Sequence, residues 1–344
     1  MEILYSFAFA DMLGKPLWVW LTFAGVVVAL LVFDLGLFNR KDHVMGVGES
    51  LRLSAFYIGA GALFGAWVWW WMGQTAGVSF FTGFLIEKSL SLDNVFVISL
   101  IFATFAIPRE YQHRVLFWGI LGVVLLRGIM IGAGTALVHN FEWVLWVFGA
   151  FLLLTGVKML FSSHDAAPDI AANPVLRLAR RVLRVSKTLH GHKFFVREPA
   201  EDGSGRRVLT ATPLFLALVM VESADVIFAV DSVPAIFAIT TDPYIVYTSN
   251  IFAILGLRAL YFALAAMIHR FHYLKYALSI VLIFIGGKII YTQLYGKVDP
   301  ALSLAVTAAL LAGGVVVSLI KSRNELPTPA EALVESSASG ENRP

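Results

Sequence analysis

The chain has 344 residues, of which 58% are hydrophobic and only 14% are charged, and its mean hydropathy is +0.78. This composition excludes an ordinary soluble domain and indicates a polytopic membrane protein. The sequence contains no cysteine, which excludes disulfides, thiolate metal sites and thiol redox chemistry. The formal net charge of +3 is small, so its meaning depends on where the basic residues fall.

Apolar runs of about 20 residues, the length at which a helix spans the hydrocarbon core, predict an all-α polytopic membrane protein with about nine transmembrane helices. The runs lie near residues 17–38, 52–73, 79–107, 115–137, 143–162, 211–240, 246–268, 275–294 and 301–320. The third and sixth runs, at roughly 30 residues each, are long for a single crossing, which indicates strong tilt or an internal break.

Basic side chains mark alternate connections between these runs. Lys and Arg follow the first, third, fifth, seventh and ninth runs, whereas residues 74–78, 138–142 and 241–245 contain none. By the positive-inside rule the basic connections face the cytoplasm. We therefore expect the N-terminus outside and the C-terminus in the cytoplasm.

Two of the runs carry polar side chains near their middle, in the matching segments EKSLSLDNV and DVIFAVDSV. Ionisable groups at that depth cost roughly 2.5–3.5 kcal/mol each, so they usually face the bundle interior and serve a function. One such helix could be an accident, but two in the two halves of a chain indicate a shared polar site. The candidate oxygen donors are Glu87, Asp93, Asn94, Glu222, Asp225 and Asp231.

The repeat continues beyond these segments. LLRGIMI around Arg127 matches GLRALYF around Arg258, and TGVKML around Lys158 matches IGGKII around Lys288. Because the repeated unit has three helices, an odd number, its second copy enters the membrane from the opposite side, which is the inverted-repeat architecture of many secondary transporters. The predicted units are residues 1–78 with two helices, 79–162 as repeat 1, a basic cytoplasmic loop at 163–210, 211–294 as repeat 2, a last helix at 295–320 and a disordered tail at 321–344.

Helical spacing limits which donors can converge. At 100° per residue, Glu87 and Asn94 share a face, whereas Asp93 lies about 120° away from Glu87 and Asp231 about 120° away from Asp225. Either the helices are broken, or the acids form two layers along a path. We favour a break before Pro234, which lacks a backbone donor and would free carbonyl oxygens.

Carboxylate and amide oxygens without sulfur suit hard or borderline divalent ions, namely Mg²⁺, Ca²⁺ or Mn²⁺. Arg127 and Arg258 cannot coordinate a cation, so we interpret them as counter-ions to the acids. Lys158 and Lys288 are interpreted as structural, and Asp34 as either an entry gate or an interfacial structural group. The structural alternative for the acids is salt bridging to the two arginines, which would hold helices together.

The loop at 163–210 contains the segment PVLRLARRVLRVSKTLHGHKFF, which predicts a basic amphipathic helix. Its arginines lie on one side, and Leu178, Val182, Val185 and Leu189 lie on the other. We expect this helix to lie on anionic lipid of the inner leaflet rather than to bind nucleic acid. No protein partner is predicted.

The segments FLIEKSLSLDNVFVISLIFATFAIP, REYQHRVLFWGILGVVLLRGIMI, VESADVIFAVDSVPAIFAIT and SNIFAILGLRALYF resemble the TerC family of integral membrane proteins, and its Alx-type members most, over about residues 17–320. The resemblance implies manganese export or wider metal-ion homeostasis in a bacterial inner membrane, and it maps the family's intramembrane acids onto the six donors. The family's older labels are tellurium resistance and redox modulator. A chain without cysteine gives the redox label no physical support.

The sequence therefore predicts a transporter, not an enzyme, that exports Mn²⁺ as its substrate and has no permanently bound cofactor. Export against an inside-negative potential is uphill by roughly 2.3 kcal/mol per charge per 100 mV, so a driving ion is needed, and proton antiport through the same carboxylates is the simplest choice. One alternative is a membrane scaffold that recruits partners through the basic loop. An intramembrane aspartyl protease is disfavoured because the GxGD motif is absent.

Overall fold

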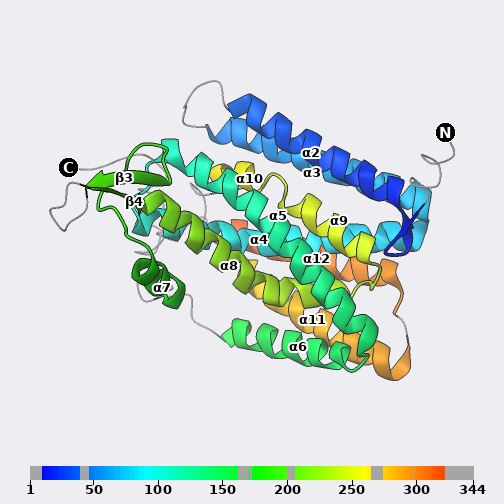
Figure 1. Cartoon of the computed structure of the whole chain (residues 1–344). Helices are drawn as coiled ribbons and strands as arrows, with labels where there is room; N and C mark the ends of the chain where they lie inside the picture. Colours follow the sequence, from blue (N-terminus) through cyan, green and yellow to red (C-terminus); the bar gives the residue numbers. More distant parts are fainter. Residues whose placement is uncertain are drawn as a thin grey trace, which may run out of the picture.

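The computed structural model describes residues 10–38, 46–161, 170, 173–199, 206–264, 274–296 and 298–321. Most of these residues form helices that lie side by side in one bundle (Figure 1). The helices are α2 (Leu17–Phe38), α3 (Val47–Met72), α4 (Gln74–Thr104), α5 (Arg109–Asn140), α6 (Val144–Phe161), α7 (Pro174–Val182), α8 (Pro213–Phe237), α9 (Pro243–Ile254), α10 (Leu257–Leu264), α11 (Leu274–Tyr295) and α12 (Pro300–Lys321). The predicted all-α fold is confirmed.

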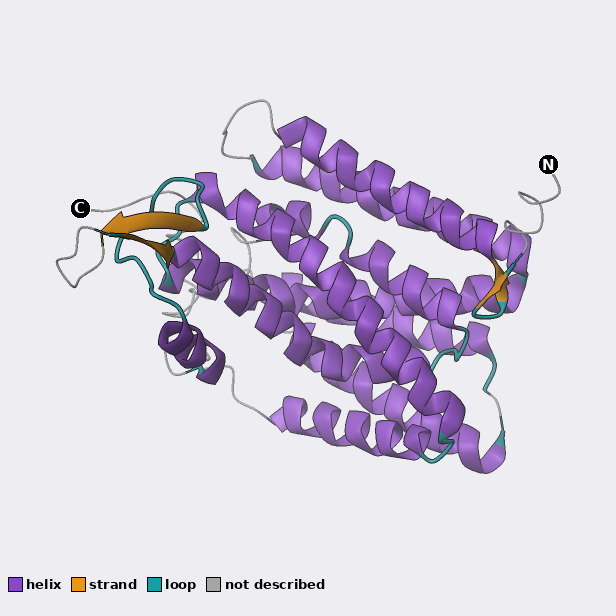
Figure 2. Ribbon diagram, in the orientation of Figure 1, coloured by secondary structure: helices purple, strands orange, loops and turns teal. Residues whose placement is uncertain are grey.

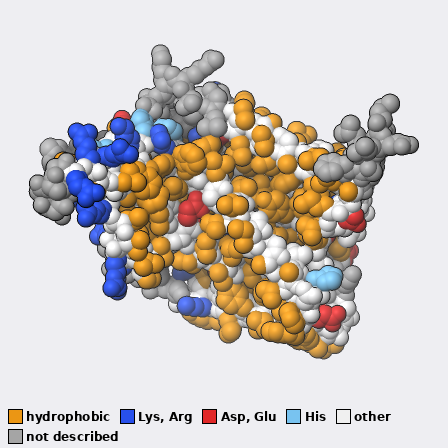
Figure 3. Space-filling view, viewed as in Figure 1, with side chains coloured by type: hydrophobic (Ala, Val, Ile, Leu, Met, Phe, Trp, Pro, Cys, Tyr) orange, Lys and Arg blue, Asp and Glu red, His pale blue; other side chains and the backbone are white. Residues whose placement is uncertain are grey.

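Two antiparallel strand pairs lie at opposite ends of the bundle (Figure 2). The strands β1 (Asp11–Met12) and β2 (Lys15–Pro16) precede α2, while β3 (Phe195–Pro199) and β4 (Arg207–Ala211) lie beside α7. Lys and Arg side chains gather at the β3–β4 end, whereas hydrophobic side chains cover the flank of the bundle (Figure 3). This distribution fits a bundle whose flank faces lipid and whose basic end faces one aqueous side.

Eight segments of the described chain are long and apolar enough to cross a membrane: α2, α3, α5, α6, α8, α9 together with α10, α11 and α12. The remaining long helix, α4, has 31 residues and is long enough to span as well, but it carries Glu87, Lys88 and Asp93 close together. It packs against α3, α8, α9 and α12. A helix that carries charges through a bilayer must bury them against protein, and α4 meets this requirement.

Helices that the sequence repeat relates pack in matching ways. α4 lies against α9 as α8 lies against α5, and α6 packs along α11. The α6–α11 contact is close because Gly156 and Gly286 leave no side chain between the backbones; a Cβ at Gly156 would lie 2.8 Å from the Ser279 carbonyl oxygen. The inverted topology itself stays a prediction.

The predicted break before Pro234 is wrong. α8 is continuous through Pro234 and ends at Phe237, because a proline in the last turn removes a backbone hydrogen bond without unwinding the turns before it. The break lies instead between α9 and α10, at Leu255 and Gly256. Gly256 has φ +80, and a Cβ there would lie 2.6 Å from the Tyr57 Cβ, so both the backbone conformation and the contact require glycine.

The predicted basic helix is shorter than expected. α7 ends at Val182, and the chain then turns into β3, so Val185 and Leu189 are not helical. Within α7, Leu176 is buried in the bundle while Leu178 and Val182 remain exposed. The helix is drawn nearly end-on in Figure 2 and thus runs across the bundle axis, as a helix parallel to a membrane surface would. The predicted tail at 321–344 lies, apart from Lys321, outside the described residues.

Candidate functional site

Arg127, in the middle of α5, is completely buried and holds acids from two helices. Its Nε and Nη2 donate to the two carboxylate oxygens of Asp225 on α8, at 3.2 and 3.0 Å. Its Nη1 lies 2.8 Å from Oε1 of Glu87 on α4. The fork of the guanidinium thus binds Asp225 through two bonds and Glu87 through a third, a geometry that is strong because both partners are charged.

Two uncharged groups complete this arrangement. Nη1 of Arg127 also donates to Ser232 Oγ at 2.7 Å and to Asn250 Oδ1 at 2.9 Å. The Asn250 amide in turn donates to Glu87 Oε2 at 3.2 Å. We call these five residues, from α4, α5, α8 and α9, the Arg127 cluster. With both carboxyls ionised, the cluster would hold one positive and two negative side chains, and thus one negative charge in excess at the centre of the bundle.

Sequence spacing explains how α8 contributes two members. Asp225 and Ser232 are seven residues apart, which places them two turns apart on one face of a continuous helix. Glu87 and Asn94 have the same spacing on α4. Glu87 joins the cluster, whereas Asn94 lies further along α4 and lines a cavity beside it.

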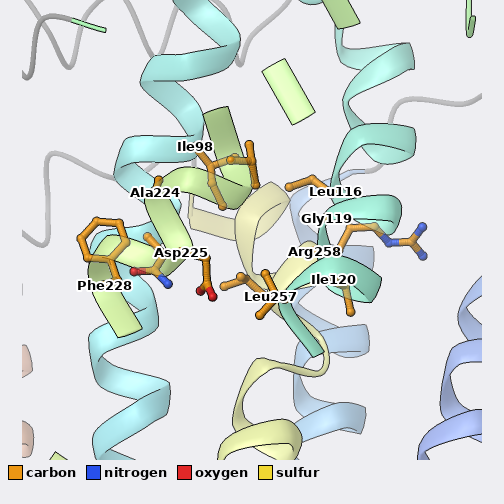
Figure 4. Close-up of a pocket in the computed structure, with 12 residues that line it drawn as sticks. Ile98, Leu116, Gly119, Ile120, Ala224, Asp225, Phe228, Leu257 and Arg258 are labelled. Carbon is orange, nitrogen blue, oxygen red and sulfur yellow. The ribbon is translucent and has the colours of Figure 1, made fainter. Parts of the chain in front are cut away.

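This inner cavity lies on the side of the cluster toward the end of α5 nearest the basic loop. Figure 4 shows the residues that line it. Its volume is about 20 Å³, room for about one water molecule. Asn94, Asp225 and Arg258 are its charged or amide residues, and the others are apolar or glycine. The Asp225 carboxylate points into it, while the Arg258 guanidinium points away (Figure 4).

Two buried oxygens near the cluster have no hydrogen-bond partner among the described residues, namely Asn94 Oδ1 and Glu222 Oε2. Glu222 lies against α5, where a Cβ at Gly122 would be 2.0 Å from Glu222 Oε1. Buried polar atoms are almost always paired, so such atoms suggest a place where water or an ion supplies the missing contact.

A second buried ion pair joins Arg258 of α10 to Asp34 of α2. Arg258 Nη2 lies 2.5 Å from Asp34 Oδ1, and the Tyr57 hydroxyl donates to the same oxygen at 2.9 Å. Both predicted counter-ion arginines are therefore paired with carboxylates. For Asp34, this contact fits the structural alternative rather than a free entry gate.

Asp93 and Asp231 lie apart from the Arg127 cluster. Asp93 interacts with the Lys275 ammonium of α11, and Asp231 interacts with Thr155 and Lys158 of α6. Because α4 and α8 are continuous, side chains six residues apart point in different directions, and the six predicted donors do not meet at one point. Over the described parts of the chain, no group of three or more acidic or histidine side chains is arranged to hold a metal. Lys288 donates to Ser303 at 3.0 Å, which fits its predicted structural role.

Sequence reasoning missed the role of Lys88. Its ammonium donates to the carbonyl oxygens of Ala253 at 3.0 Å and Leu255 at 3.4 Å, so it satisfies the end of α9 where the helix breaks. Asn250 was also missed. The sequence signal for each role is weak. Lys88 lies beside Glu87 in an apolar run, and Asn250 is an amide in the run at 246–268.

A polar cluster outside the membrane helices fixes the β3–β4 hairpin. The Ser186 hydroxyl donates to Glu198 Oε1 at 2.7 Å, and His190 Nε2 lies 2.8 Å from the same oxygen. The bond from Ser186, followed by that from His190, holds the pKa of the Glu198 carboxyl below its ordinary value. These contacts are local to the hairpin and do not reach the Arg127 cluster.

Residues 72–326, from the end of α3 to beyond α12, match the model of the family described as "Integral membrane protein TerC family". The chain belongs to the TerC family. It is therefore a multi-pass integral membrane protein, as its apolar helices indicate. No solved structure matches it.

Curated relatives match the chain over most of its length. "Uncharacterized membrane protein STKORF319" of Myxococcus xanthus is 49% identical over 319 residues, which are 93% of this chain and 97% of the relative. "Putative membrane-bound redox modulator Alx" of Escherichia coli (strain K12) is 46% identical over 307 residues, 87% of this chain and 92% of the relative. An "Uncharacterized membrane protein" of Rickettsia bellii is 46% identical over 302 residues, 88% of this chain and 97% of the relative.

Proposed function

We propose that this TerC-family protein is a secondary transporter that exports Mn²⁺ from the cytoplasm across a bacterial inner membrane, and that protons drive the export. The observation that carries the proposal is the Arg127 cluster, in which two carboxylates from the paired helices α4 and α8 hold one cationic group at the bundle centre. Buried acids inside a membrane bundle are typical of ion pathways.

The cluster has the donors that a hard divalent ion prefers. Glu87 and Asp225 offer carboxylate oxygens, Asn250 offers an amide oxygen and Ser232 a hydroxyl, all now directed at the guanidinium. A metal ion and the Arg127 guanidinium cannot both bind these oxygens tightly, because the two cations repel each other. We infer that the ion and the guanidinium compete for the two carboxylates.

The inner cavity lies on the basic side of Asp225 and has room for about one water molecule, and we infer that the ion approaches Asp225 through it. Asn94, whose side-chain oxygen has no partner in the described structure, lies beside this approach and would replace one water of the ion's shell. Proton coupling follows from the same chemistry, since a protonated carboxylate binds a cation poorly. Protons arriving from outside would therefore release the metal.

The redox description of the relatives is a weaker candidate for this chain. Thiol–disulfide exchange needs cysteine, and this sequence has none. Metal export could still alter the redox state of a cell indirectly, which would reconcile the relatives' name with a transporter.

The test is metal uptake into inside-out proteoliposomes that contain the purified protein. We expect Mn²⁺ uptake that increases when the lumen is acidic, with Ca²⁺ and Mg²⁺ compared under the same conditions. Glu87→Gln and Asp225→Asn should each abolish uptake, while Glu142→Gln, an equivalent change at an exposed site between α5 and α6, should not. Wild-type uptake in both cluster variants would refute the site, and no uptake of any ion by the wild type would refute the transporter.

A further inference from the structure

A second, larger cavity lies in the half of the bundle opposite the basic loop. Its volume is about 900 Å³, and it opens between α5, α9 and the β1–β2 turn. On α5 its lining residues fall between Gly128 and Asn140, and on α9 it is lined by Pro243 and Tyr247. Its polar groups include Thr135, His139 and Asn140.

This outer cavity begins where the Arg127 cluster ends. Gly128 follows Arg127 in α5, and the Tyr247 hydroxyl lies 3.2 Å from the place of a Cβ on Gly128. The inner cavity touches α5 only at residues 116–123, and the outer cavity only at residues 128–140. Arg127 lies between these two stretches. The cluster therefore separates a cavity on the basic side from a cavity on the other side.

We propose that the outer cavity is a water-filled half-channel through which a hydrated divalent cation leaves the Arg127 cluster on the side opposite the basic loop. This inference rests on the proposed transport function and specifies the exit route. At about 30 Å³ per water, the cavity holds on the order of 30 waters, which is ample for an ion that keeps several of its own.

Most of the residues that line this cavity are apolar, but Thr135, His139, Asn140, Thr241 and Tyr247 offer water hydrogen-bonding groups that a lipid chain could not use. Tyr247 makes no hydrogen bond to any described residue. Its hydroxyl oxygen is not fully buried, so it faces the open cavity. A hydroxyl facing hydrocarbon would lose a hydrogen bond that water supplies. The polar groups at 135, 139 and 140 continue along the same helix toward its end.

The absence of cysteine from the sequence makes a direct test possible. Single cysteines are placed in the full-length protein at two lining positions, Gly132→Cys and Thr135→Cys. A Cβ at Gly132 meets no atom within 4 Å, so the first change fits without strain in packing. The matched controls on the same helix are Ile129→Cys and Leu137→Cys, which point outward with 61% and 46% of their surface exposed.

Right-side-out vesicles are treated with a membrane-impermeant cationic thiosulfonate, and labelling rates are measured by mass spectrometry. Only a thiolate reacts, and thiolates form in water but not in lipid, so the lining cysteines should react at least about tenfold faster than the controls. The labelling is repeated with an anionic thiosulfonate. It should react more slowly than the cationic one, because the carboxylates of the cluster repel it.

Lining cysteines that react as slowly as the controls would show a lipid-filled or closed cavity and overturn the proposal. Reaction only from the basic side would overturn it as well. Labelling requires no transport, so a failure of Mn²⁺ uptake in the inside-out proteoliposomes would refute the proposed function without affecting the labelling result for the half-channel. If both proposals hold, labelled Thr135→Cys should also stop Mn²⁺ uptake.

Discussion

Replacing Arg127 by Gln tests the central ion-pair arrangement most directly. The change removes every bond that the guanidinium gives to Glu87 and Asp225 and leaves two carboxylates unpaired in the bundle centre. Deleting one partner of a buried ion pair typically costs about 3–5 kcal/mol, because an uncompensated charge stays buried. We therefore expect Arg127→Gln to unfold at a clearly lower temperature than the wild type in the same detergent.

The same variant should respond to metal. With the guanidinium gone, the two carboxylates, Ser232 and Asn250 are available to a divalent ion. A ligand that binds only the folded state at one hundred times its Kd stabilises it by about 2.7 kcal/mol, so Mn²⁺ should recover a large part of the loss. The intrinsic fluorescence of nine tryptophans reports unfolding with and without Mn²⁺.

Arg258→Gln is the matched control. It removes the other buried guanidinium, which pairs with Asp34 of α2 rather than with Glu87 or Asp225. It should lose stability too, but Mn²⁺ should not restore it. Equal rescue of both variants, or an Arg127→Gln protein as stable as the wild type, would contradict the placement of the ion at the Arg127 cluster.

Three further changes probe the supporting structure. Gly256→Ala should destabilise the protein by about 1–3 kcal/mol in thermal unfolding, because the residue has a positive φ and its Cβ would meet Tyr57; an unchanged midpoint would show that the α9–α10 break adapts. Lys88→Met should cost about 1–3 kcal/mol per orphaned carbonyl group, whereas Lys88→Arg should retain most of the stability; equal loss in both would mean that size rather than donation matters. Glu198 has a lowered pKa, so its contribution is present at neutral pH and is lost as the pH falls through the folded-state value. Limited proteolysis of the β3–β4 hairpin should thus quicken on acidification in the wild type, and Glu198→Gln should be cleaved quickly at neutral pH already.

Much of the fold could be predicted from local patterns. Runs of apolar residues located the membrane helices to within a few residues, since span length is set by bilayer thickness. The break in the seventh run could not be found this way. Glycines are frequent in membrane helices, and neither the positive φ of Gly256 nor its contact with Tyr57, some 200 positions earlier in the chain, is written in the local sequence.

The candidate site was predicted in part. Depth in the membrane picked out Glu87, Asp225 and Arg127, and the structural alternative of an Asp225–Arg127 salt bridge is what the structure shows. The expectation of a broken helix placed Asp93 and Asp231 in the same site, but α4 and α8 are continuous, so these two side chains point elsewhere. Their partners Lys275 and Lys158 come from α11 and α6, and no single-sequence pattern states which helices are neighbours.

The contacts of the two related arginines are unequal, and this inequality bears on the mechanism. The repeat relates Glu87 to Asp225 and Arg127 to Arg258, so a symmetric arrangement would give each arginine one of these acids. Instead Arg127 binds both, and Arg258 binds Asp34 of α2, a helix outside the repeat. With the second guanidinium away from the centre and both carboxyls ionised, the cluster would carry an excess negative charge, which a divalent ion needs in order to compete with Arg127. The added N-terminal helices therefore help to set the charge of the proposed ion site, rather than serving only as a lipid-facing cover for the repeat.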